Sequence, residues 1–264
     1  MRTVISRPRI IPTLLIDEGN LVKTKRFKNP NYLGDPINAI KIFNEKGVDE
    51  LCVLDISASK KGRAPGMDLL RNMATEAFMP LSYGGGITTF EQIREIFYMG
   101  FEKVVLNTSL VQDFDLFERA AAYFGSQSIV ASIDYKKGLG KETCYIMDGT
   151  QKSRFTPVEL AVKAEKLGAG EILLYSIDRD GMKKGYDLKM ISEIARHVQI
   201  PVIACGGAAG LKDLKSALDV GAHAVAAGSL FVYFGSRDAV LINFPEEREL
   251  IQSNIFEEQN DGRI

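Results

Sequence analysis

The sequence predicts a single (β/α)₈ barrel, the TIM-barrel architecture, built from two similar halves. Three observations lead to this prediction: the chain length, an uninterrupted alternation of short apolar runs with amphipathic stretches, and an internal repeat. The chain has 264 residues, which is close to the ~250 residues typical of such a barrel. We therefore expect one domain over residues 1–264, with half-barrels at about 5–125 and 126–250.

The predicted strands are short apolar runs. Helical patterns such as Phe90–Met99 and Val158–Leu167 lie between them, and this alternation is typical of a parallel sheet. Eight such units favour closure as a barrel. In chain order, the expected strands are Ile10–Ile16, Glu50–Ile56, Pro80–Tyr83, Lys103–Leu106, Ile129–Ile133, Glu171–Ile177, Val202–Cys205 and Ala224–Ala227.

An internal repeat supports the division into halves, because matching residues that keep one constant sequence offset are unlikely to arise by chance. The pairs at an offset of 121 (171 − 50 = 121) are Glu50 with Glu171, Pro80 with Pro201, Gly85 with Gly206, Gly86 with Gly207, Gly100 with Gly221, and Thr108 with Ser229. Upstream, the run Arg9–Gly19 matches Ser128–Gly138 at an offset of 119 (128 − 9 = 119). Each half is then four βα units.

Two insertions interrupt the pattern. One is a basic loop, Gly19–Asp35, after the first strand, and the other is Lys141–Phe155 after the fifth. In the second insertion, Asp148-Gly149 between two short runs of strand character predicts a hairpin turn. Both insertions follow a strand, so we expect them on the C-terminal face, where TIM barrels carry their active sites. The tail, about Glu257–Ile264, looks disordered.

Composition excludes several classes of function. The 33 basic and 34 acidic residues nearly cancel, so no overall field favours nucleic acid or an anionic membrane. Cys52, Cys144 and Cys205 favour a reduced compartment over disulfides, and no apolar stretch reaches the ~20 residues of a membrane span. We therefore expect a cytoplasmic protein. With only His197 and His223, no spacing indicates a metal site or a Cys–His nucleophile, and no cofactor is expected.

Two glycine turns at repeat-related positions predict a pair of phosphate sites. Gly84–Gly86 precedes a capping box of Thr88 and Glu91 at a helix start, and Gly206–Gly207 is its repeat mate. Such turns let a phosphate approach backbone N–H groups. A lone glycine pair more often marks close packing, but the duplication favours an elongated substrate with two phosphates. The expected sites are Gly85, Gly86, Asn107 and Thr108, and Asp180, Gly181, Gly206, Gly207, Gly228 and Ser229.

Asp134, at the end of the fifth predicted strand, is the candidate catalyst. An ionisable residue at the C-terminal end of a barrel strand is typical of catalysis. The alternative is a cap of the following loop. We favour catalysis for Asp134.

Several motifs resemble the cyclase subunit of imidazole glycerol phosphate synthase, over about residues 9–231. That resemblance implies a duplicated half-barrel paired with a class I glutaminase. Ammonia from the glutaminase passes through the barrel and attacks a ribulosyl-aminoimidazole-carboxamide bis-phosphate, giving imidazole glycerol phosphate and an aminoimidazole carboxamide ribotide. The motifs are Arg9-Ile-Ile, Asp49-Glu-Leu, Leu54-Asp-Ile-Ser-Ala-Ser, Gly84-Gly-Gly-Ile, Asn107-Thr, Phe124-Gly-Ser-Gln, Gly168-Ala-Gly-Glu-Ile-Leu-Leu, Ser176-Ile-Asp-Arg-Asp-Gly and Gly206-Gly-Ala.

The resemblance also implies an ammonia gate, a ring of charges at the bottom of the barrel, formed by Arg9, Glu50, Lys103 and Glu171. Each of these residues precedes or begins a predicted strand, which places it on the N-terminal face. Strand starts are often charged simply because they are exposed, yet the four identities together favour the gate. The glutaminase is then expected on the N-terminal face, with Glu102 as a rim contact.

Leu15 departs from the family pattern. The family uses two catalytic aspartates, ending strands one and five, and this chain has Leu15 in place of the first (134 − 15 = 119, the repeat register). Losing a positioned acid or base typically costs ~10²–10⁴ in rate. Asp17, about 6.6 Å further along the same strand face, is the candidate substitute. Tyr175 is a second departure, where the family usually has a small hydroxyl residue.

Three hypotheses remain open. A divergent branch with this leucine, and with an ending like Gly228-Ser-Leu-Phe-Val, resembles subunits from bacterial surface-polysaccharide gene clusters, where the ammonia serves amidation of a sugar. The chain is thus a histidine-type cyclase, or a paralogue that uses or relays ammonia for such amidation. A phosphoribosyl isomerase of the related half-barrel family is disfavoured, because it needs two carboxylates and no gate.

Overall fold

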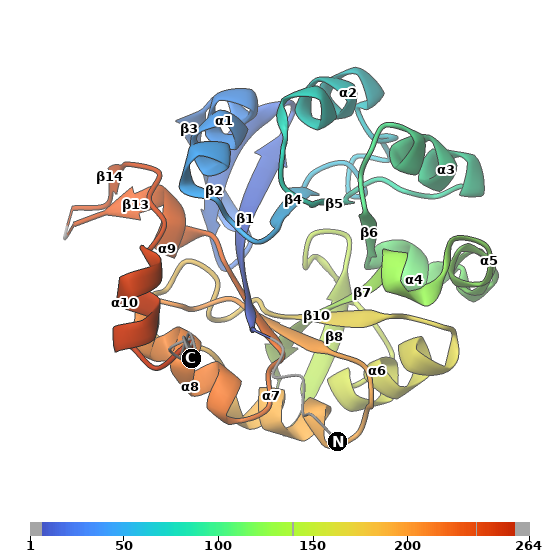
Figure 1. Cartoon of the computed structure of the whole chain (residues 1–264). Coiled ribbons are helices and arrows are strands. Elements are labelled where there is room, and N and C mark those ends of the chain that lie inside the picture. Colours follow the sequence, from blue (N-terminus) through green and yellow to red (C-terminus); the bar gives the residue numbers. More distant parts are fainter. Residues whose placement is uncertain (1–6, 139, 236, 257–264) are drawn as a thin grey trace, which may run out of the picture.

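Eight parallel strands close into a barrel, as the computed structural model shows for residues 7–138, 140–235 and 237–256 (Figure 1). The expected disordered tail lies outside these residues. β1 pairs with β12, and β7 pairs with β10, so the eight-stranded barrel has no open edge. The barrel strands are β1 (Arg9–Asp17), β4 (Leu51–Asp55), β5 (Leu81–Gly84), β6 (Lys103–Leu106), β7 (Ile129–Lys137), β10 (Glu171–Ser176), β11 (Val202–Cys205) and β12 (Ala224–Ala227). The predicted barrel is confirmed.

Helices surround the strands (Figure 1). The two helices that the sequence predicts, Phe90–Met99 and Val158–Leu167, agree with α3 and α6 to within one residue at each end. The helices are α1 (Pro36–Lys46), α2 (Met67–Glu76), α3 (Phe90–Tyr98), α4 (Thr108–Gln112), α5 (Phe114–Phe124), α6 (Pro157–Lys166), α7 (Leu188–Ala195), α8 (Leu211–Asp219), α9 (Ser229–Val232) and α10 (Glu247–Gln252), with a 3₁₀ turn η1 at Ser126–Ser128.

Alternation along each strand separates two cores. On β1, Ile10 and Leu14 face outward and pack in the core beneath the helices, whereas Ile11 faces the barrel interior. This period of two is a property of the extended backbone. Leu15 is on the same side as Ile11, because the two residues are separated by an even number of positions. The interior face therefore runs from Arg9 at the bottom of β1 to Leu15 at its top.

The start of α3 differs from expectation by one residue. The N-cap is Thr89, whose hydroxyl accepts a hydrogen bond from Gln92 N at 3.3 Å, so the capping box is Thr89 with Gln92 rather than Thr88 with Glu91. Thr88 precedes the N-cap, and its N–H donates to the Gln92 side chain at 2.8 Å. Both pairs have the same spacing, so the pattern alone does not choose between them.

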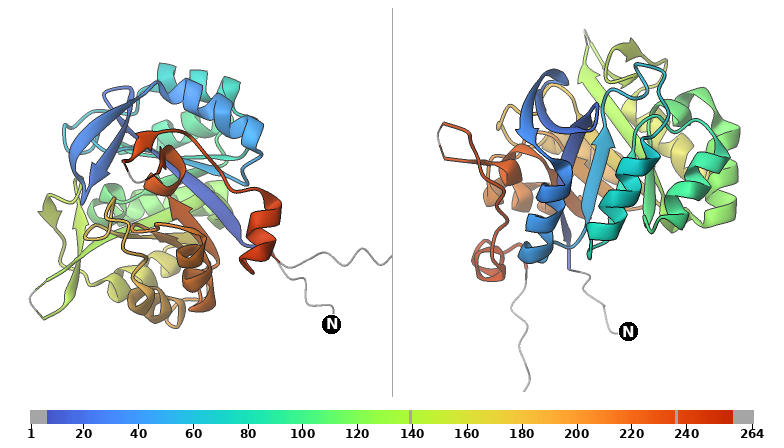
Figure 2. Two further views of the ribbon diagram at one scale, coloured as in Figure 1. Left: turned by 90° about the vertical axis from the view of Figure 1, so that its left-hand side faces the viewer. Right: turned by 90° about the horizontal axis from the view of Figure 1, so that it is seen from above.

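Both insertions are antiparallel hairpins at the C-terminal end of the barrel (Figure 2). The prediction of a loop for the first insertion is wrong. This insertion forms β2 (Asn20–Lys25) and β3 (Lys28–Gly34). The second forms β8 (Glu142–Ile146) and β9 (Gln151–Lys152). Its turn is confirmed at Asp148-Gly149, where both residues have positive φ (56° and 65°).

The end of the chain adds a small hairpin beside the barrel. Its strands are β13 (Tyr233–Phe234) and β14 (Ala239–Val240), and α10 follows at the other end of the molecule (Figure 2). Across the described residues, no helix has the length and apolar character needed to cross a membrane.

Candidate active site

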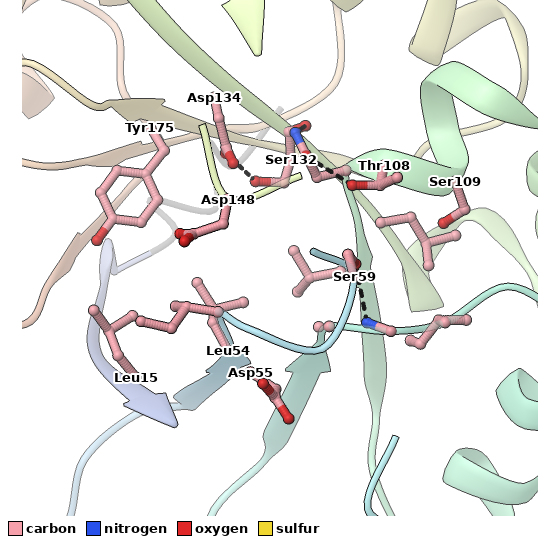
Figure 3. Close-up of a pocket in the computed structure, with 18 of the residues that line it drawn as sticks. Leu15, Leu54, Asp55, Ser59, Thr108, Ser109, Ser132, Asp134, Asp148 and Tyr175 are labelled. Atoms are coloured by element: carbon pink, nitrogen blue, oxygen red, sulfur yellow. Dashed lines mark hydrogen bonds between the residues drawn. The ribbon is translucent and has the colours of Figure 1, made fainter. Parts of the chain in front are cut away.

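A pocket of about 650 Å³ opens at the C-terminal ends of the barrel strands (Figure 3). The predicted catalyst lines it together with all four residues of the first predicted phosphate site. The position where the family has its other aspartate lies in the same pocket, because Leu15 forms part of its wall. The residues concerned are Asp134, Gly85, Gly86, Asn107, Thr108 and Leu15.

Asp134 is buried at the end of the barrel part of β7. Its Oδ1 accepts a hydrogen bond from the Ser132 hydroxyl at 2.8 Å. Burial raises the pKa of Asp134 from 3.8 to about 7; the Ser132 bond opposes this shift, and the negative charges of Asp148 and Asp180 add to it. A carboxyl group with such a pKa can both donate and accept a proton near neutral pH.

The first glycine turn is shaped by close packing as well as by the pocket. Gly85 has φ = 126°, and a Cβ there would lie 2.4 Å from the backbone oxygen of Asp55, so only glycine fits. Nearby, the Asn107 amide donates to the backbone oxygens of Ser132 (3.1 Å) and Tyr145 (3.2 Å). The packing interpretation of the turn therefore holds, and Asn107 orders the wall of the pocket.

A second pocket, of about 260 Å³, gathers every residue of the second predicted phosphate site. These residues are Asp180, Gly181, Gly206, Gly207, Gly228 and Ser229. Lys23 of β2 also lines this pocket, and sequence reasoning missed it. The only signal was the basic character of the first insertion, and nothing in the sequence indicates that this lysine, 4% exposed, is buried.

Asp180 anchors the β2–β3 hairpin onto the barrel. Its carboxylate accepts hydrogen bonds from Lys23 Nζ (2.7 Å), Thr24 Oγ1 (2.7 Å) and Phe27 N (3.2 Å). The Tyr175 hydroxyl donates to the same carboxylate at 3.1 Å. Asp180 is therefore engaged by the protein itself, and Lys23 is the cation that faces the second pocket.

Tyr175 stands between the two pockets and lines both. Its ring packs edge-on against Phe27, with centroids 4.8 Å apart. A small hydroxyl residue in this position would leave the two pockets less separated. The substitution therefore changes the shape of the mouth of the barrel.

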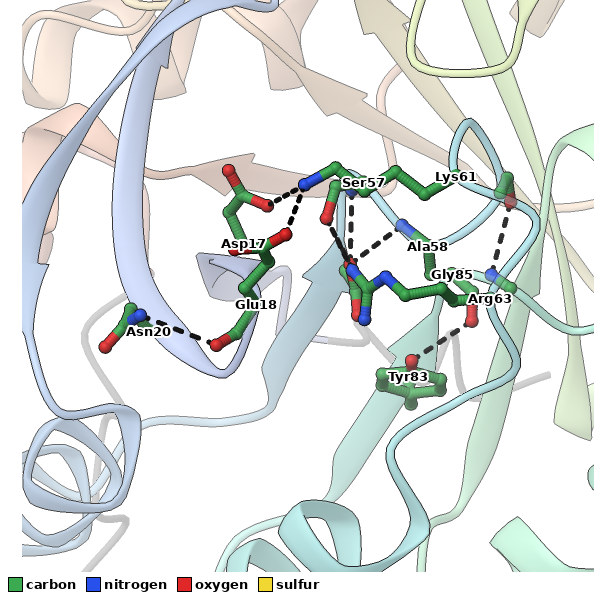
Figure 4. Close-up of polar contacts among 12 residues, drawn as sticks. Asp17, Glu18, Asn20, Ser57, Ala58, Lys61, Arg63, Tyr83 and Gly85 are labelled. Carbon is green, nitrogen blue, oxygen red and sulfur yellow. Dashed lines mark hydrogen bonds and ion pairs between the residues drawn. The ribbon is translucent and has the colours of Figure 1, made fainter.

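The carboxylate of the candidate substitute Asp17 points toward Lys61 (Figure 4). Its Oδ1 lies 3.6 Å from Lys61 Nζ, and Lys61 also binds Glu18 at 2.6 Å. Asp17 is not among the described residues that line the pocket of Asp134. Its placement thus gives no support to Asp17 as the replacement for the carboxylate missing at Leu15.

Asp148, a residue that sequence reasoning used only as a turn signal, lies in the pocket with Asp134 (Figure 3). Its side chain is 12% exposed, and Lys60 Nζ is 3.7 Å from its Oδ2. Burial raises the pKa of Asp148 to about 7, and Lys60 opposes the shift. The pocket therefore holds two carboxyl groups that titrate near neutral pH.

The four residues predicted to form the gate make one closed ring at the N-terminal end of the barrel. Arg9 binds Glu50 (2.5 Å) and Glu171 (2.5 Å). Lys103 binds the same two carboxylates, at 2.9 and 3.0 Å. Burial opposes the charge of Arg9, but the two glutamates outweigh it and raise the pKa of Arg9. Each cation lies between both anions, so the ring is neutral and shut.

A small cavity lies inside the barrel above this ring. Glu50 of the ring lines its lower end, and Val105 lines both this cavity and the pocket of Asp134. Cys52 and Ser82 supply the polar atoms of its wall. This cavity therefore lies between the charge ring and the pocket of Asp134.

Comparisons with known proteins point to one group. The family described as "Histidine biosynthesis protein" matches residues 9–238. The Pseudomonas aeruginosa protein named "Putative imidazole glycerol phosphate synthase subunit hisF2" is 50% identical over 246 residues, 92% of this chain and 98% of that protein. The "Imidazole glycerol phosphate synthase subunit HisF" of Petrotoga mobilis is 41% identical over 227 residues, 85% of this chain and 90% of that protein.

Proposed function

This chain belongs to the histidine biosynthesis protein family, and from that premise we propose that it is an ammonia-using cyclase subunit of imidazole glycerol phosphate synthase type. Relatives at 41–50% identity carry that subunit's name. In this role the protein converts the ribulosyl-aminoimidazole-carboxamide bis-phosphate into imidazole glycerol phosphate. The nitrogen comes from a glutaminase partner.

The observation that carries the proposal is the order of three features along the barrel: the charge ring at the N-terminal end, the interior cavity, and Asp134 at the C-terminal end. The ring of Arg9, Glu50, Lys103 and Glu171 lies at one end of a small interior cavity, and Val105 lines both this cavity and the pocket of Asp134. A barrel enzyme whose substrates enter only from the mouth needs no such ring. Two pockets with glycine turns, one of them holding Lys23, suit the two phosphates of an elongated substrate.

The composition of the N-terminal face favours a glutaminase partner. A groove there is lined by Phe97, Phe101 and Phe124 together with Lys103 of the ring. Glu102, the expected rim contact, lines the same groove. Phe101 is buried and the other two phenylalanines are partly buried, and a groove with apolar walls beside charged groups suits a protein interface. We propose that a class I glutaminase docks here and opens the ring.

Asp134 supplies the acid–base chemistry at the other end. Burial keeps much of its carboxyl group protonated at neutral pH, so it can donate a proton to the oxygen that ammonia displaces from the substrate. The Ser132 hydroxyl fixes its orientation. Its place at the end of a barrel strand matches the site of catalysis in this fold.

The direct test supplies the bis-phosphate with an ammonium salt and looks for imidazole glycerol phosphate. Free ammonium removes the need for the partner, so the barrel is tested alone. Product formation that depends on Asp134 is the expected result. Measurable binding of the bis-phosphate without any product would contradict the proposal.

Two observations favour a second candidate, the paralogue that uses or relays ammonia for amidation of a sugar. Leu15 makes the wall opposite Asp134 apolar, and Tyr175 divides the two pockets. Under this alternative the same assay gives no imidazole glycerol phosphate, whereas glutamine hydrolysis by the partner still rises when the barrel is added.

A further inference from the structure

The carboxylate of Asp148 is placed where a second acid–base group is needed. It extends from the β8–β9 turn into the pocket that also contains Asp134 and Leu15 (Figure 3). Leu15 is the position at which the resemblance implies a catalytic aspartate. The pocket thus lacks a carboxylate on β1 and has one on the hairpin that follows β7.

The turn that carries Asp148 is held firmly. Met147, Asp148 and Gly149 all have positive φ, a conformation that persists where the surroundings enforce it. Met147 N donates to the Thr108 hydroxyl at 3.1 Å, and Lys136 Nζ donates to the backbone oxygen of Gly149 at 2.6 Å. The hairpin is thereby tied to the wall of the same pocket.

The described carboxylates that line the pocket differ in how they are engaged. Asp55 accepts hydrogen bonds from the backbone N–H groups of Ser57 (3.1 Å) and Ala58 (3.0 Å), so it holds its own loop. Asp134 and Asp148 carry no backbone bond of this kind among the described residues. The ammonium group of Lys60, 3.7 Å from Asp148, favours the ionised form of Asp148.

We infer that Asp148 is the second catalytic acid–base residue of this site, acting together with Asp134 in place of the carboxylate that the family has at the position of Leu15. The inference rests on the proposed function, and it names a residue of that same site. The missing group has moved from a barrel strand to an inserted hairpin.

The first chemical step shows what each carboxyl group does. The nitrogen of ammonia bonds to the ketone carbon of the ribulosyl group, and the π pair of the carbonyl moves to its oxygen. Protonated Asp134 gives its proton to that oxygen, and ionised Asp148 takes one proton from the nitrogen. The product is a neutral carbinolamine, with Asp134 ionised and Asp148 protonated.

The exchanged proton states suit the next step. Asp148 returns its proton to the departing hydroxyl group, which leaves as water, and Asp134 takes a proton from the nitrogen. The imine forms, and both carboxyl groups regain their starting states. One carboxyl group alone would have to release and rebind a proton between these steps.

The experiment compares Asp148→Asn with the unchanged protein, using the bis-phosphate and ammonium chloride. Asparagine tolerates positive φ, so the turn is kept. We expect kcat to fall by ~10²–10⁴ without a rise in KM, and the acid limb of the kcat profile against pH to disappear. Asp148→Glu should regain part of the rate. Glu142→Gln, on the same hairpin but not lining the pocket, is the matched control.

The outcomes separate the two proposals. If the wild-type chain forms product and Asp148→Asn forms it at nearly the same rate, the role of Asp148 is overturned and the cyclase function stands. Turnover that falls with a lost acid limb supports both. Failure of the wild-type chain to make imidazole glycerol phosphate overturns the cyclase function and, with it, this role of Asp148.

Discussion

The buried carboxyl group of Asp134 makes stability depend on pH. Its folded-state pKa of about 7 lies above the ordinary 3.8, so between these values the native protein binds a proton that the unfolded chain has lost. Stability therefore falls as pH rises from about 4 to about 7, by about 4 kcal/mol in all. Asp134→Asn cannot ionise, so its advantage over the wild type in urea unfolding should grow across this range. Asp68→Asn, at a fully solvated carboxylate, should show no such trend.

Leu15 and Asp148 should be interchangeable as carriers of the second carboxylate. Leu15→Asp in the wild-type chain should leave ammonium-dependent turnover almost unchanged, because Asp148 already supplies the group. In Asp148→Asn the same substitution should recover part of the lost rate. The buried carboxylate costs about 1–3 kcal/mol in stability unless it finds a partner. A rise of ~10² or more in ammonium-dependent turnover when Leu15→Asp is made in the wild-type chain would show that Asp148 does not supply the missing carboxylate.

The positions of residues at strand ends were predictable from sequence. The positions of residues whose role depends on a partner distant in the sequence were not. Asp134 and Glu171 were placed correctly because each adjoins an apolar run whose strand direction fixes its face. Lys23 gained its role only from Asp180, which lies far along the chain. Asp148 was recognised as a turn residue, but the sequence does not show that the turn points into the pocket.

At the scale of elements, the β2–β3 hairpin depends on one buried ion pair. Lys23→Met would leave the carboxylate of Asp180 without its cation, and breaking a buried pair typically costs about 3–5 kcal/mol. Lower stability in urea unfolding and weaker binding of the bis-phosphate are both expected. Lys25→Met, at an exposed position on the same strand, is the control. Equal effects of the two substitutions would contradict the importance of the pair.

Elements with a strong periodic pattern were predictable, and the first hairpin shows why others were not. The barrel strands appear as apolar runs because both of their faces are buried. The segment 20–34 contains several lysines, so its charge indicated a solvated loop. One of those lysines is buried against Asp180, and the backbone pairing that makes the hairpin leaves no apolar run to recognise.

For the whole molecule, the closed ring predicts that coupling and chemistry can be separated. Lys103→Glu leaves one cation among three carboxylates, and Lys103→Met removes the cation without adding a charge. Both should lower the yield of product per glutamine hydrolysed in the complex, while turnover with free ammonium stays near the wild-type level. Lys212→Glu, on an exposed part of α8, is the control. A parallel loss of both activities would mean that the ring serves the fold rather than ammonia transfer.

The composition of the ring also bears on how two duplicated halves could diverge. Glu50 and Glu171 are repeat mates, but the counterpart of Arg9 is Ser128 and that of Lys103 is Ala224 (103 + 121 = 224). Two copies of the first half would supply four basic and two acidic groups, and two copies of the second half would supply acidic groups alone. Neither symmetric pairing of the present halves would form a neutral ring, so the neutral ring depends on the sequence difference between the halves.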